Sequence, residues 1–272
     1  MTLLSASAAV HHAAKDGNSA AEYEDAWSVA RPTQPDEEFD ARGWRCAVAD
    51  GASESLLAGR WAGELVREFA GSVAAADPAS FAAAVRRAAD RWPAVVARYT
   101  EQRENEGRPV KWYERPGLEK GAHATLLTVE VAPGAHDADG TGEARAGWRA
   151  SALGDTCVFQ IRDDDLLTAF PMADSASFDT SPPLVGSRDP DTALLAERVL
   201  SHTGDLRGGD DLYLATDALA AWFLTRYERG ERPWRVLCDL GVTVGFDEWL
   251  ARERSDGRMR NDDVTLVHLN AW

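Results

Sequence analysis

Residues 46–62 of the chain read CAVADGASESLLAGRWA. A short apolar run ends in Asp50-Gly51, small polar residues follow, and the first turn of an amphipathic helix comes next. Because Asp-Gly is a common turn dipeptide, this pattern fits an ordinary strand-to-helix turn. It equally fits a strand that places the Asp50 carboxylate at its tip, where the carboxylate can bind a ligand. The rest of the chain has to decide between these two interpretations.

The composition indicates an acidic protein with a sizeable core. The chain has 272 residues, of which 44% are hydrophobic, and it contains ten Trp. Its formal net charge of −16 disfavours binding to nucleic acid or to an anionic membrane, because like charges repel. Three widely spaced Cys without a CxxC pair favour reduced thiols over disulfides or a zinc site. Since the sequence shows neither a signal-peptide pattern nor an apolar run of roughly 20 residues, we expect a soluble cytoplasmic protein.

Strand-like and helix-like segments recur along the chain. Alternating or short apolar runs predict strands at residues 5–10, 26–30, 43–50, 122–132, 144–155, 156–165, 166–170, 211–217 and 262–269. Apolar residues at helical spacing predict helices at residues 55–70, 79–99, 219–229, 234–240 and 246–253. In the second helix, Asp77 is the expected cap and Pro93 an expected kink. The expected loops are residues 31–42, 101–120, 133–143 and 173–191.

These elements favour an α+β architecture. Many antiparallel strands, an early helical pair and a late helical group fit two β-sheets that pack face to face, each covered by helices. The fold class is therefore predicted to be a four-layer α/β/β/α sandwich with two antiparallel sheets flanked by helices. No repeat and no long Gly/Ser linker divides the chain, so we expect residues 1–272 to form a single domain.

Carboxylates gather at the predicted strand ends. The chain has 45 Asp and Glu, so an acidic residue on its own indicates little. Position is more informative, because strands that share an end of a sheet would bring their tips into one cleft. The carboxylates at strand ends are Glu24, Asp25, Asp50, Asp155, Asp217, Asp262 and Asp263.

Such a cluster suits a hard metal ion. Mg²⁺ and Mn²⁺ prefer carboxylate, carbonyl and water oxygens, and divalent cations offset the repulsion among the carboxylates. Two such ions can share a bridging carboxylate and activate water for attack on phosphorus. Gly51 allows the backbone to turn tightly and to expose its carbonyl as a further ligand. Each motif alone also fits a plain turn or, for Asp217, a helix cap; only the ordered set is specific.

Six segments follow one another along nearly the whole chain: EYEDAW (22–27), AVADGAS (47–53), GAHATLLTV (121–129), ALGDTCVFQI (152–161), YLATDALAAW (213–222) and RNDDVTLVHL (260–269). In this order they resemble the motifs of the metal-dependent protein serine/threonine phosphatases, the type 2C or PPM family, in its bacterial form. The resemblance implies a β-sandwich flanked by helices, in agreement with the predicted elements.

The resemblance also implies a reaction and a cofactor. The reaction is one-step hydrolysis of phosphoserine or phosphothreonine in proteins, by a hydroxide that bridges two Mg²⁺ or Mn²⁺ ions and without a phosphoenzyme. The two residues that it makes catalytic are Asp50, which would bridge both ions, and Asp25, which would orient metal-bound waters.

The remaining ligands divide between the ions. By resemblance, Glu24 and the Gly51 carbonyl serve one ion, and Asp217 and Asp262 hold the other. Asp155 matches a carboxylate that helps a third, weaker ion in some members. The implied partners are a phosphorylated protein substrate and a serine/threonine kinase that the phosphatase opposes.

Three positions depart from the family pattern. Ala52 stands where many members have a histidine that acts as general acid, a role worth roughly 10²–10⁴-fold in rate. Ala20 stands where members often have an arginine that binds the substrate phosphate, which leaves other arginines, such as Arg42, Arg60 or Arg188, as candidates. Ala218 replaces the usual glycine after Asp217.

Two other functions stay open beside the phosphatase. Ala20 and Ala52 fit a pseudophosphatase, a regulatory module that binds phosphoprotein or kinase through the same cleft. A two-metal nuclease or phosphodiesterase fits the carboxylates but not the net charge.

Three further features have simple structural interpretations. His123 fits a core or second-shell histidine better than a proton-transfer group. His11 and His12 are adjacent on a strand and so face opposite ways, which favours packing over metal binding. The Trp residues are expected in the core and in sheet packing.

Overall fold

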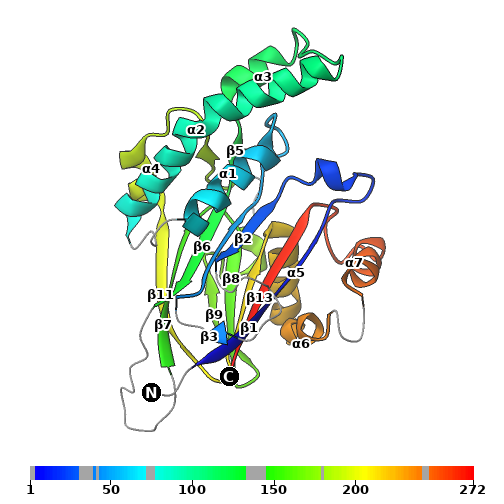
Figure 1. Ribbon diagram of the computed structural model, residues 1–272. Coiled ribbons are helices and arrows are strands. Elements are labelled where there is room, and N and C mark those ends of the chain that lie inside the picture. Colours follow the sequence, from blue (N-terminus) through cyan, green and yellow to red (C-terminus); the bar gives the residue numbers. More distant parts are fainter. Residues whose placement is uncertain are drawn as a thin grey trace.

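The computed structural model describes residues 4–30, 39–40, 43–71, 77–132, 145–178, 181–240 and 245–272. Two antiparallel β-sheets pack face to face, and helices cover the outer face of each (Figure 1). The predicted fold class, an α+β four-layer α/β/β/α sandwich, is thereby confirmed.

The two sheets contain all but two of the described strands. The six-stranded sheet has the order β3 (Phe39–Asp40), β1 (Ser5–Ala13), β13 (Val264–Ala271), β12 (Asp211–Ala215), β8 (Cys157–Arg162) and β9 (Asp165–Phe170). The five-stranded sheet has the order β11 (Leu200–Arg207), β7 (Arg145–Leu153), β6 (Leu126–Val131), β4 (Arg45–Ala49) and β2 (Ala26–Ala30). A short pair, β5 (His123–Ala124) and β10 (Val185–Gly186), lies beside them.

The inner faces of the two sheets form a continuous apolar core. Alternation along each strand sends every second side chain inward, as β6 shows with its buried Leu127, Val129 and Val131. These side chains pack with two large indoles, Trp44 and Trp148, that are almost completely buried.

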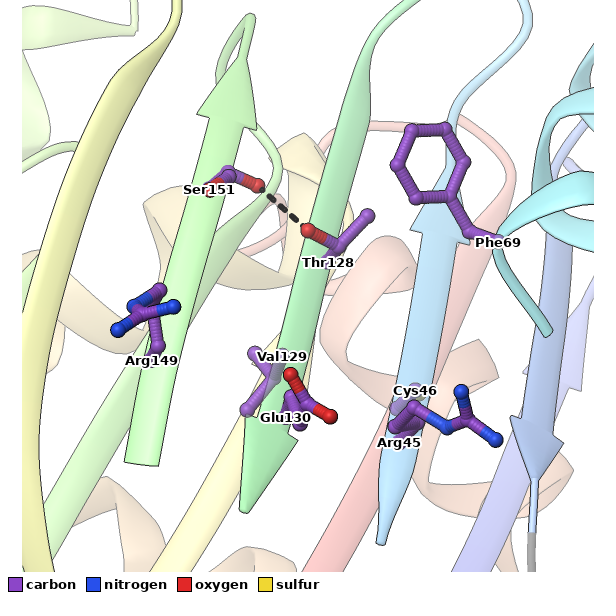
Figure 2. Close-up of a pocket in the computed structure, with 8 residues that line it drawn as sticks. All are labelled: Arg45, Cys46, Phe69, Thr128, Val129, Glu130, Arg149 and Ser151. Atoms are coloured by element: carbon purple, nitrogen blue, oxygen red, sulfur yellow. Dashed lines mark hydrogen bonds between the residues drawn. The ribbon is translucent and has the colours of Figure 1, made fainter. Parts of the chain in front are cut away.

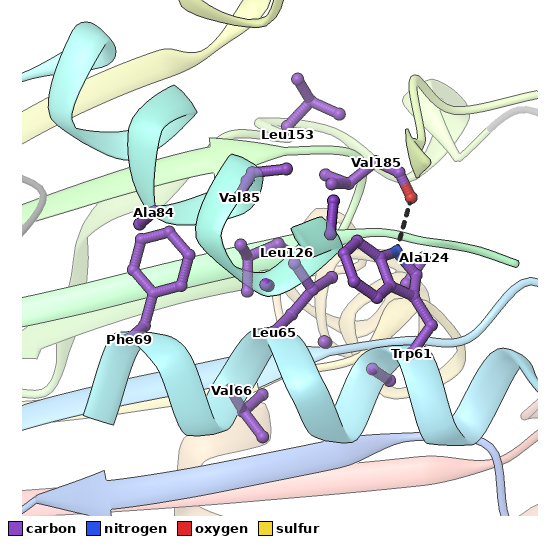
Figure 3. Close-up of a cluster of buried hydrophobic side chains, with 14 of the residues drawn as sticks. Trp61, Leu65, Val66, Phe69, Ala84, Val85, Ala124, Leu126, Leu153 and Val185 are labelled. Atoms are coloured by element: carbon purple, nitrogen blue, oxygen red, sulfur yellow. Dashed lines mark hydrogen bonds between the residues drawn. The ribbon is translucent and has the colours of Figure 1, made fainter. Parts of the chain in front are cut away.

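One helical layer covers the five-stranded sheet. It contains α1 (Ala58–Gly71), α2 (Pro78–Asn105), α3 (Arg115–Lys120) and α4 (Thr192–Arg198). Trp61, Leu65 and Phe69 form the apolar stripe of α1 and point into this layer (Figure 3). The Trp61 Nε1 donates a 2.9 Å hydrogen bond to the Val185 carbonyl, which ties α1 to β10. The predicted cap of α2 is confirmed, because Asp77 Oδ1 accepts from the Ser80 amide at 2.9 Å.

A second helical layer covers the six-stranded sheet. It contains α5 (Asp217–Glu228), α6 (Pro233–Cys238) and α7 (Phe246–Ser255). Two short 3₁₀ turns complete the elements, η1 (Ala20–Glu22) and η2 (Ser175–Ser177). None of the helices in the described parts of the chain is long and apolar enough to cross a membrane.

The structure corrects several sequence-based boundaries. The predicted loop at residues 101–120 contains the end of α2, which continues through Pro93 to Asn105, and all of α3. The strand β11 was not predicted because it is a polar strand that lies, among the described strands, at the edge of its sheet beside β7. The helix α4 was not predicted either. Residues 31–38, 41–42 and 133–143, where loops were expected, lie outside the described residues.

The expectation that the tryptophans lie in the core is wrong for two of them. Trp112, between α2 and α3, is 82% exposed, and Trp272 is 45% exposed. Trp112 makes an edge contact with the ring of Tyr113, which is itself exposed. Because neither indole joins an apolar cluster, their exposure could not be predicted from residue type.

The buried carboxylate of Glu253 in α7 allows a test of what stabilises the helical layer on the six-stranded sheet. Burial alone would raise the pKa of Glu253, but hydrogen bonds from Arg258, Trp222 and Arg226 outweigh it and lower the pKa to about 2. The folded pKa is thus below the unfolded value of 4.5, so the stabilisation is complete above pH 4.5 and is lost as pH falls toward 2.

We expect Glu253→Gln to lower the free energy of unfolding at pH 7 by about 1–3 kcal/mol, since it weakens charge-assisted hydrogen bonds. The difference from the wild type should shrink between pH 4.5 and pH 2, and urea unfolding across that range measures it. A difference that stays constant with pH would show that the carboxylate charge is not responsible.

Candidate functional site

The register of the five-stranded sheet places the first pair of carboxylates together. Strand β2 runs antiparallel to β4, with Ala26 opposite Ala49. Asp25, immediately before β2, therefore lies beside Asp50, immediately after β4. The ordinary-turn interpretation of Asp50 is incomplete, because the neighbouring strand delivers a second carboxylate to the same place.

The six-stranded sheet brings three more carboxylates to its corresponding end. Ala215, the last residue of β12, pairs with Leu266 of β13 and Cys157 of β8. Asp217 therefore follows β12 at the end where β13 begins after Asp262 and where β8 begins after Asp155.

These strand ends border a cleft of about 600 Å³. Its walls combine carboxylates with cationic and small polar side chains. The charged or titratable residues that line it are Asp50, Glu54, Asp155, Asp217, Asp262, Lys120, Arg260 and His123. Four of the predicted carboxylates and Gly51 thus line one cleft. Asp25 lies beside Asp50, whereas Glu24 lines a different pocket together with Tyr23 and Arg60.

A second cavity lies away from this cleft. It holds only about 20 Å³, enough for about one water, and lies on the outer face of the five-stranded sheet (Figure 2). Arg45, which lines it, is the first residue of β4, whereas Asp50 follows the other end of that strand. Its size and position give it no part in the carboxylate cleft.

Backbone hydrogen bonds hold Asp50 and Gly51 in place. The Asp50 carbonyl accepts from the Thr125 amide at 2.8 Å, and the Ala52 amide donates to the His123 carbonyl at 2.9 Å. A Cβ on Gly51 would lie 2.6 Å from the Glu24 carbonyl oxygen. A side-chain rotation could not remove this clash, because the contacting atom belongs to the backbone. Glycine is required at this position because two chain segments pass in close contact there.

The Gly-Asp-Thr turn is fixed in the same way. Gly154 has φ of +115°, and a Cβ there would lie 2.4 Å from the Cβ of Thr125. The hydroxyl groups of Thr125 and Thr156 lie 2.8 Å apart and share a hydrogen bond. This packing holds Asp155, which is buried, close to the segment that supports Asp50.

Asp263 is a functional residue whose role sequence reasoning missed. Its carboxylate accepts from the Lys15 amide at 2.8 Å and from the Glu24 amide at 2.6 Å. It thereby joins the start of β13 to the segments after β1 and before β2. The doubled acid in RNDDVT was the available signal, but the sequence did not show that the second Asp faces the backbone of Glu24.

A hydrogen-bonded chain also holds Asp25. Thr265 donates to Asp25 Oδ2 at 2.8 Å, and the Tyr23 hydroxyl hydrogen-bonds to the Thr265 hydroxyl. The Thr265 amide donates to Thr216 Oγ1 at 2.9 Å, which connects Asp25 to the residue before Asp217. Both sheets therefore contribute to the position of one buried carboxylate.

The carboxylates disturb one another's ionisation. Burial, and then repulsion from Asp25 and Asp217, raises the pKa of Asp50 well above its ordinary value. Burial raises the pKa of Asp25 to about 8, with Asp263 and Asp217 adding to the effect. Burial, followed by repulsion from Asp217, raises the pKa of Asp155 to about 6. Clustered, buried carboxylates of this kind are typical of sites that bind a cation or transfer protons.

Asp217 belongs to the same electrostatic group. Burial raises its pKa, and the Arg260 guanidinium opposes that shift. Asp217 Oδ2 accepts from Arg260 Nη2 at 2.8 Å. This ion pair sits within the cleft, next to the other carboxylates.

The carboxylate oxygens of the cleft suit a hard divalent cation, although the side chains are not already arranged around a metal position. Within the described ranges, no three His, Cys, Asp or Glu side chains are arranged as a ready metal site. Two buried oxygens, Asp25 Oδ1 and Asp217 Oδ1, find no hydrogen-bond partner among the described residues. Unpaired buried oxygens beside repelling carboxylates are what a bound cation would relieve. The metal-ligand roles remain predictions.

The cations near the cleft differ from the candidates named from sequence. Arg60 lies over the ring of Tyr99 and Arg188 lines a separate pocket between α2 and α3, while Arg42 falls outside the described residues. Arg260 and Lys120 line the cleft instead.

Two more groups stand near the cleft mouth. Lys15 Nζ lies 3.1 Å from Ser53 Oγ and 3.8 Å from Glu24 Oε2. His123 is half-buried in the cleft wall, not in the core, and burial followed by the charge of Lys120 lowers its pKa. The histidines of β1 pack as expected: His11 stacks on Phe246, and His12 contacts the ring of Tyr23.

Comparison with known proteins identifies the fold. No protein-family model matches the sequence, and no curated protein matches it either. Among solved structures, the serine/threonine phosphatase Stp1 from Staphylococcus aureus matches with a TM-score of 0.55 and 11% identity, over 99% of this chain and 95% of that one. The serine/threonine phosphatase PstP/Ppp from Mycobacterium tuberculosis matches with a TM-score of 0.54 and 18% identity, over 98% and 99%.

A third match holds metal ions. The catalytic domain of the serine/threonine protein phosphatase PstP, in complex with two manganese ions, has a TM-score of 0.51 and 17% identity, over 98% of this chain and 99% of that one. The chain therefore has the fold of the PPM-type serine/threonine phosphatases over nearly its whole length, as the sequence resemblance implied.

Proposed function

We propose that this protein, built on the serine/threonine phosphatase fold, is a metal-dependent phosphatase that hydrolyses phosphoserine and phosphothreonine in proteins. The observation that supports it most is the gathering of carboxylates from both sheets at one open cleft. In this proposal Asp50 would be a ligand shared by two Mg²⁺ or Mn²⁺ ions. Glu24 and the Gly51 carbonyl would hold one ion, Asp217 and Asp262 would hold the other, and Asp155 would assist a third.

When bound, the ions would supply a hydroxide from water at neutral pH and offset the charge of the phosphate. The chain's own residues would then orient the reactants. Asp25, fixed by Thr265 and with its Oδ1 unpaired among the described atoms, can hold a water through that oxygen. Asp263 fixes the backbone of Glu24, so that the Glu24 side chain starts from a defined position.

The leaving alkoxide needs a proton. Ala52 lines the cleft where a general acid would be useful, and it offers none. Because its pKa is lowered, His123 is largely neutral at pH 7 and is a weak donor. The proton would therefore come from water, at some cost in rate.

The cleft also suits a phosphorylated protein as partner. The protein's net charge of −16 repels anions in general, so the cations at the cleft, Arg260 and Lys120, give it local attraction for a phosphate group. The same net charge disfavours nucleic acid and anionic membranes. A serine/threonine kinase that phosphorylates the substrate, and a cytoplasmic location, complete the proposal.

A pseudophosphatase is the second candidate, and one observation favours it. Ala20 lies in the exposed turn η1 and has no side chain that could bind phosphate. Together with Ala52, this position would fit a module that binds phosphoprotein or kinase without hydrolysing the ester.

An assay with and without metal tests the proposal. We expect the purified chain to release phosphate from a phosphothreonine peptide and from p-nitrophenyl phosphate when Mn²⁺ is present. A chelator should abolish the activity, and added Mn²⁺ or Mg²⁺ should restore it, because the carboxylates alone cannot activate water. Calorimetry on the same samples measures metal and peptide binding.

The other outcomes separate the alternatives. Binding of Mn²⁺ and phosphopeptide without turnover would contradict the enzyme and support the pseudophosphatase. Cleavage of bis-p-nitrophenyl phosphate in preference to the monoester would point to a phosphodiesterase instead.

A further inference from the structure

Arg260 is a cationic side chain among the carboxylates that line the cleft. Its guanidinium lies within the carboxylate cluster and donates to Asp217 Oδ2 at 2.8 Å. Asp217 is one of the carboxylates to which the proposed function gives a metal ion. Asp217 Oδ1 has no hydrogen-bond partner among the described residues and is the oxygen left for a cation. A dication there and the guanidinium at Oδ2 would share one carboxylate, across which their charges repel.

The backbone around Arg260 is anchored, while its side chain is half exposed and is held by the ion pair with Asp217. Asn261 exchanges hydrogen bonds with the backbone of Asp16, at 2.7 Å and 3.2 Å. Arg254, which is almost completely buried, donates to the Asp262 carbonyl. The Arg260 side chain, by contrast, is 51% exposed. A fixed backbone with a long exposed side chain allows the guanidinium to move within the cleft without a change in fold.

The other cations are less suited to such movement. Lys15 is held between Ser53 and Glu24. Lys120, at the end of α3, also lines the cleft, is exposed and presents a point charge. A guanidinium offers a planar fork of donors that matches the oxygens of a phosphate.

We propose that Arg260 has two partners in turn: Asp217 when the cleft is free of metal, and the phosphate group of the substrate once cations occupy the carboxylates. This inference rests on the proposed function and adds to it the group that recognises the phosphate. In the metal-free protein the ion pair offsets the charge of Asp217. With a cation held at Asp217, the Arg260 guanidinium would leave that carboxylate and be available to a phosphate group in the cleft. Arg260 would then supply the phosphate-binding arginine, so that none is needed at position 20, where this chain has Ala20.

Two affinities test the proposal without any turnover. Arg260→Gln should bind Mn²⁺ more tightly than the wild type, by about 2- to 5-fold, because the competing ion pair is gone. The Mn²⁺-loaded variant should bind inorganic phosphate about 10- to 100-fold more weakly, because it loses charge-assisted hydrogen bonds. Both are measured by titration calorimetry. Arg260→Lys should retain part of the phosphate affinity, since it keeps the charge but not the fork.

Arg252→Gln is the matched control. Arg252 is an exposed arginine of α7 that is not among the residues lining the cleft, and its replacement removes the same net charge. The control should change both affinities by less than 2-fold.

The outcomes judge the role of Arg260 separately from the proposed phosphatase activity. Opposite shifts of the two affinities in Arg260→Gln support the role of Arg260. An unchanged or weaker affinity for Mn²⁺, or an unchanged affinity for phosphate, overturns it. If the wild type binds Mn²⁺ and phosphate but hydrolyses no phosphopeptide, the phosphatase fails while Arg260 is still judged by the affinities. If the wild type binds no Mn²⁺, both proposals fail.

Discussion

Replacing Asp50 by Asn should lower kcat for a phosphothreonine peptide by about 10³-fold or more. Asp50 stands at the tip of β4, between Asp25 and Asp217, and is the carboxylate to which the proposed function gives both ions. An amide has the same shape but carries no charge, so it would weaken the binding of both ions at once. Initial rates at saturating Mn²⁺ measure the effect.

The same substitution should stabilise the metal-free protein. Asp50 is half-buried beside other carboxylates, and their mutual repulsion disfavours the folded state when no cation is present. Asn removes that repulsion while it keeps the packing. Thermal unfolding in a chelator should therefore show a higher Tm for Asp50→Asn than for the wild type, and added Mn²⁺ should raise the Tm of the wild type more than that of the variant.

An acidic residue on the protein surface provides the control. Asp90 pairs with Arg86 on α2, and its side chain is 59% exposed. Asp90→Asn should leave both kcat and the response to Mn²⁺ unchanged. If Asp50→Asn kept more than about a tenth of the wild-type activity, Asp50 could not have the central role proposed for it.

The ends of the strands that border the cleft could be predicted from the sequence, because local patterns determine where these strands stop. An apolar run that stops at Asp50, Asp155 or Asp217 marks a tip, and antiparallel pairing then brings the tips to one edge. The helices α1, α2, α5, α6 and α7 followed equally from their apolar stripes, whereas the short helices α3 and α4 did not. The strand β11 did not, because most of its side chains are exposed or half-buried, with only Leu206 of the strand buried, and its pairing with β7 depends on backbone hydrogen bonds.

The partners of individual side chains could not be predicted in the same way. Arg260 is two residues from Asp262, yet its guanidinium meets Asp217, which lies 43 residues earlier in the chain. Asp263 holds the amide of Glu24, which lies 239 residues away. The first contact depends on the pairing of β12 with β13, and the second on how the two sheets face each other. No local pattern in the sequence carries that information.

Asp210 is a further residue whose role became visible only in the structure. It lies in the turn between β11 of one sheet and β12 of the other and is completely buried. Its carboxylate accepts from Arg162 Nε at 2.8 Å, from Gln160 Nε2 at 2.9 Å and from the Arg207 amide at 3.0 Å. Gln160 Oε1 in turn accepts from Trp148 Nε1 at 3.1 Å, so the network crosses from β8 to β7 through the inner core.

Asp210→Asn should lower the free energy of unfolding by about 3–5 kcal/mol, because Arg162 would lose the charge that compensates it in a buried setting. For a chain of this size that corresponds to a decrease in Tm of roughly 6–15 °C. Guanidinium unfolding and calorimetry measure the two quantities, and Mn²⁺ is left out so that metal binding does not contribute.

The control for Asp210 uses the same arginine. Asp205 Oδ2 also accepts from Arg162 Nη2, at 2.9 Å, but the Asp205 side chain is 55% exposed. Because water screens an exposed pair, Asp205→Asn should cost no more than about 1 kcal/mol. Equal losses in the two variants would mean that burial does not set the strength of this network. A large loss only in Asp210→Asn would show that this one buried carboxylate, in the turn that joins the two sheets, stabilises the sandwich whose strand ends form the carboxylate cleft.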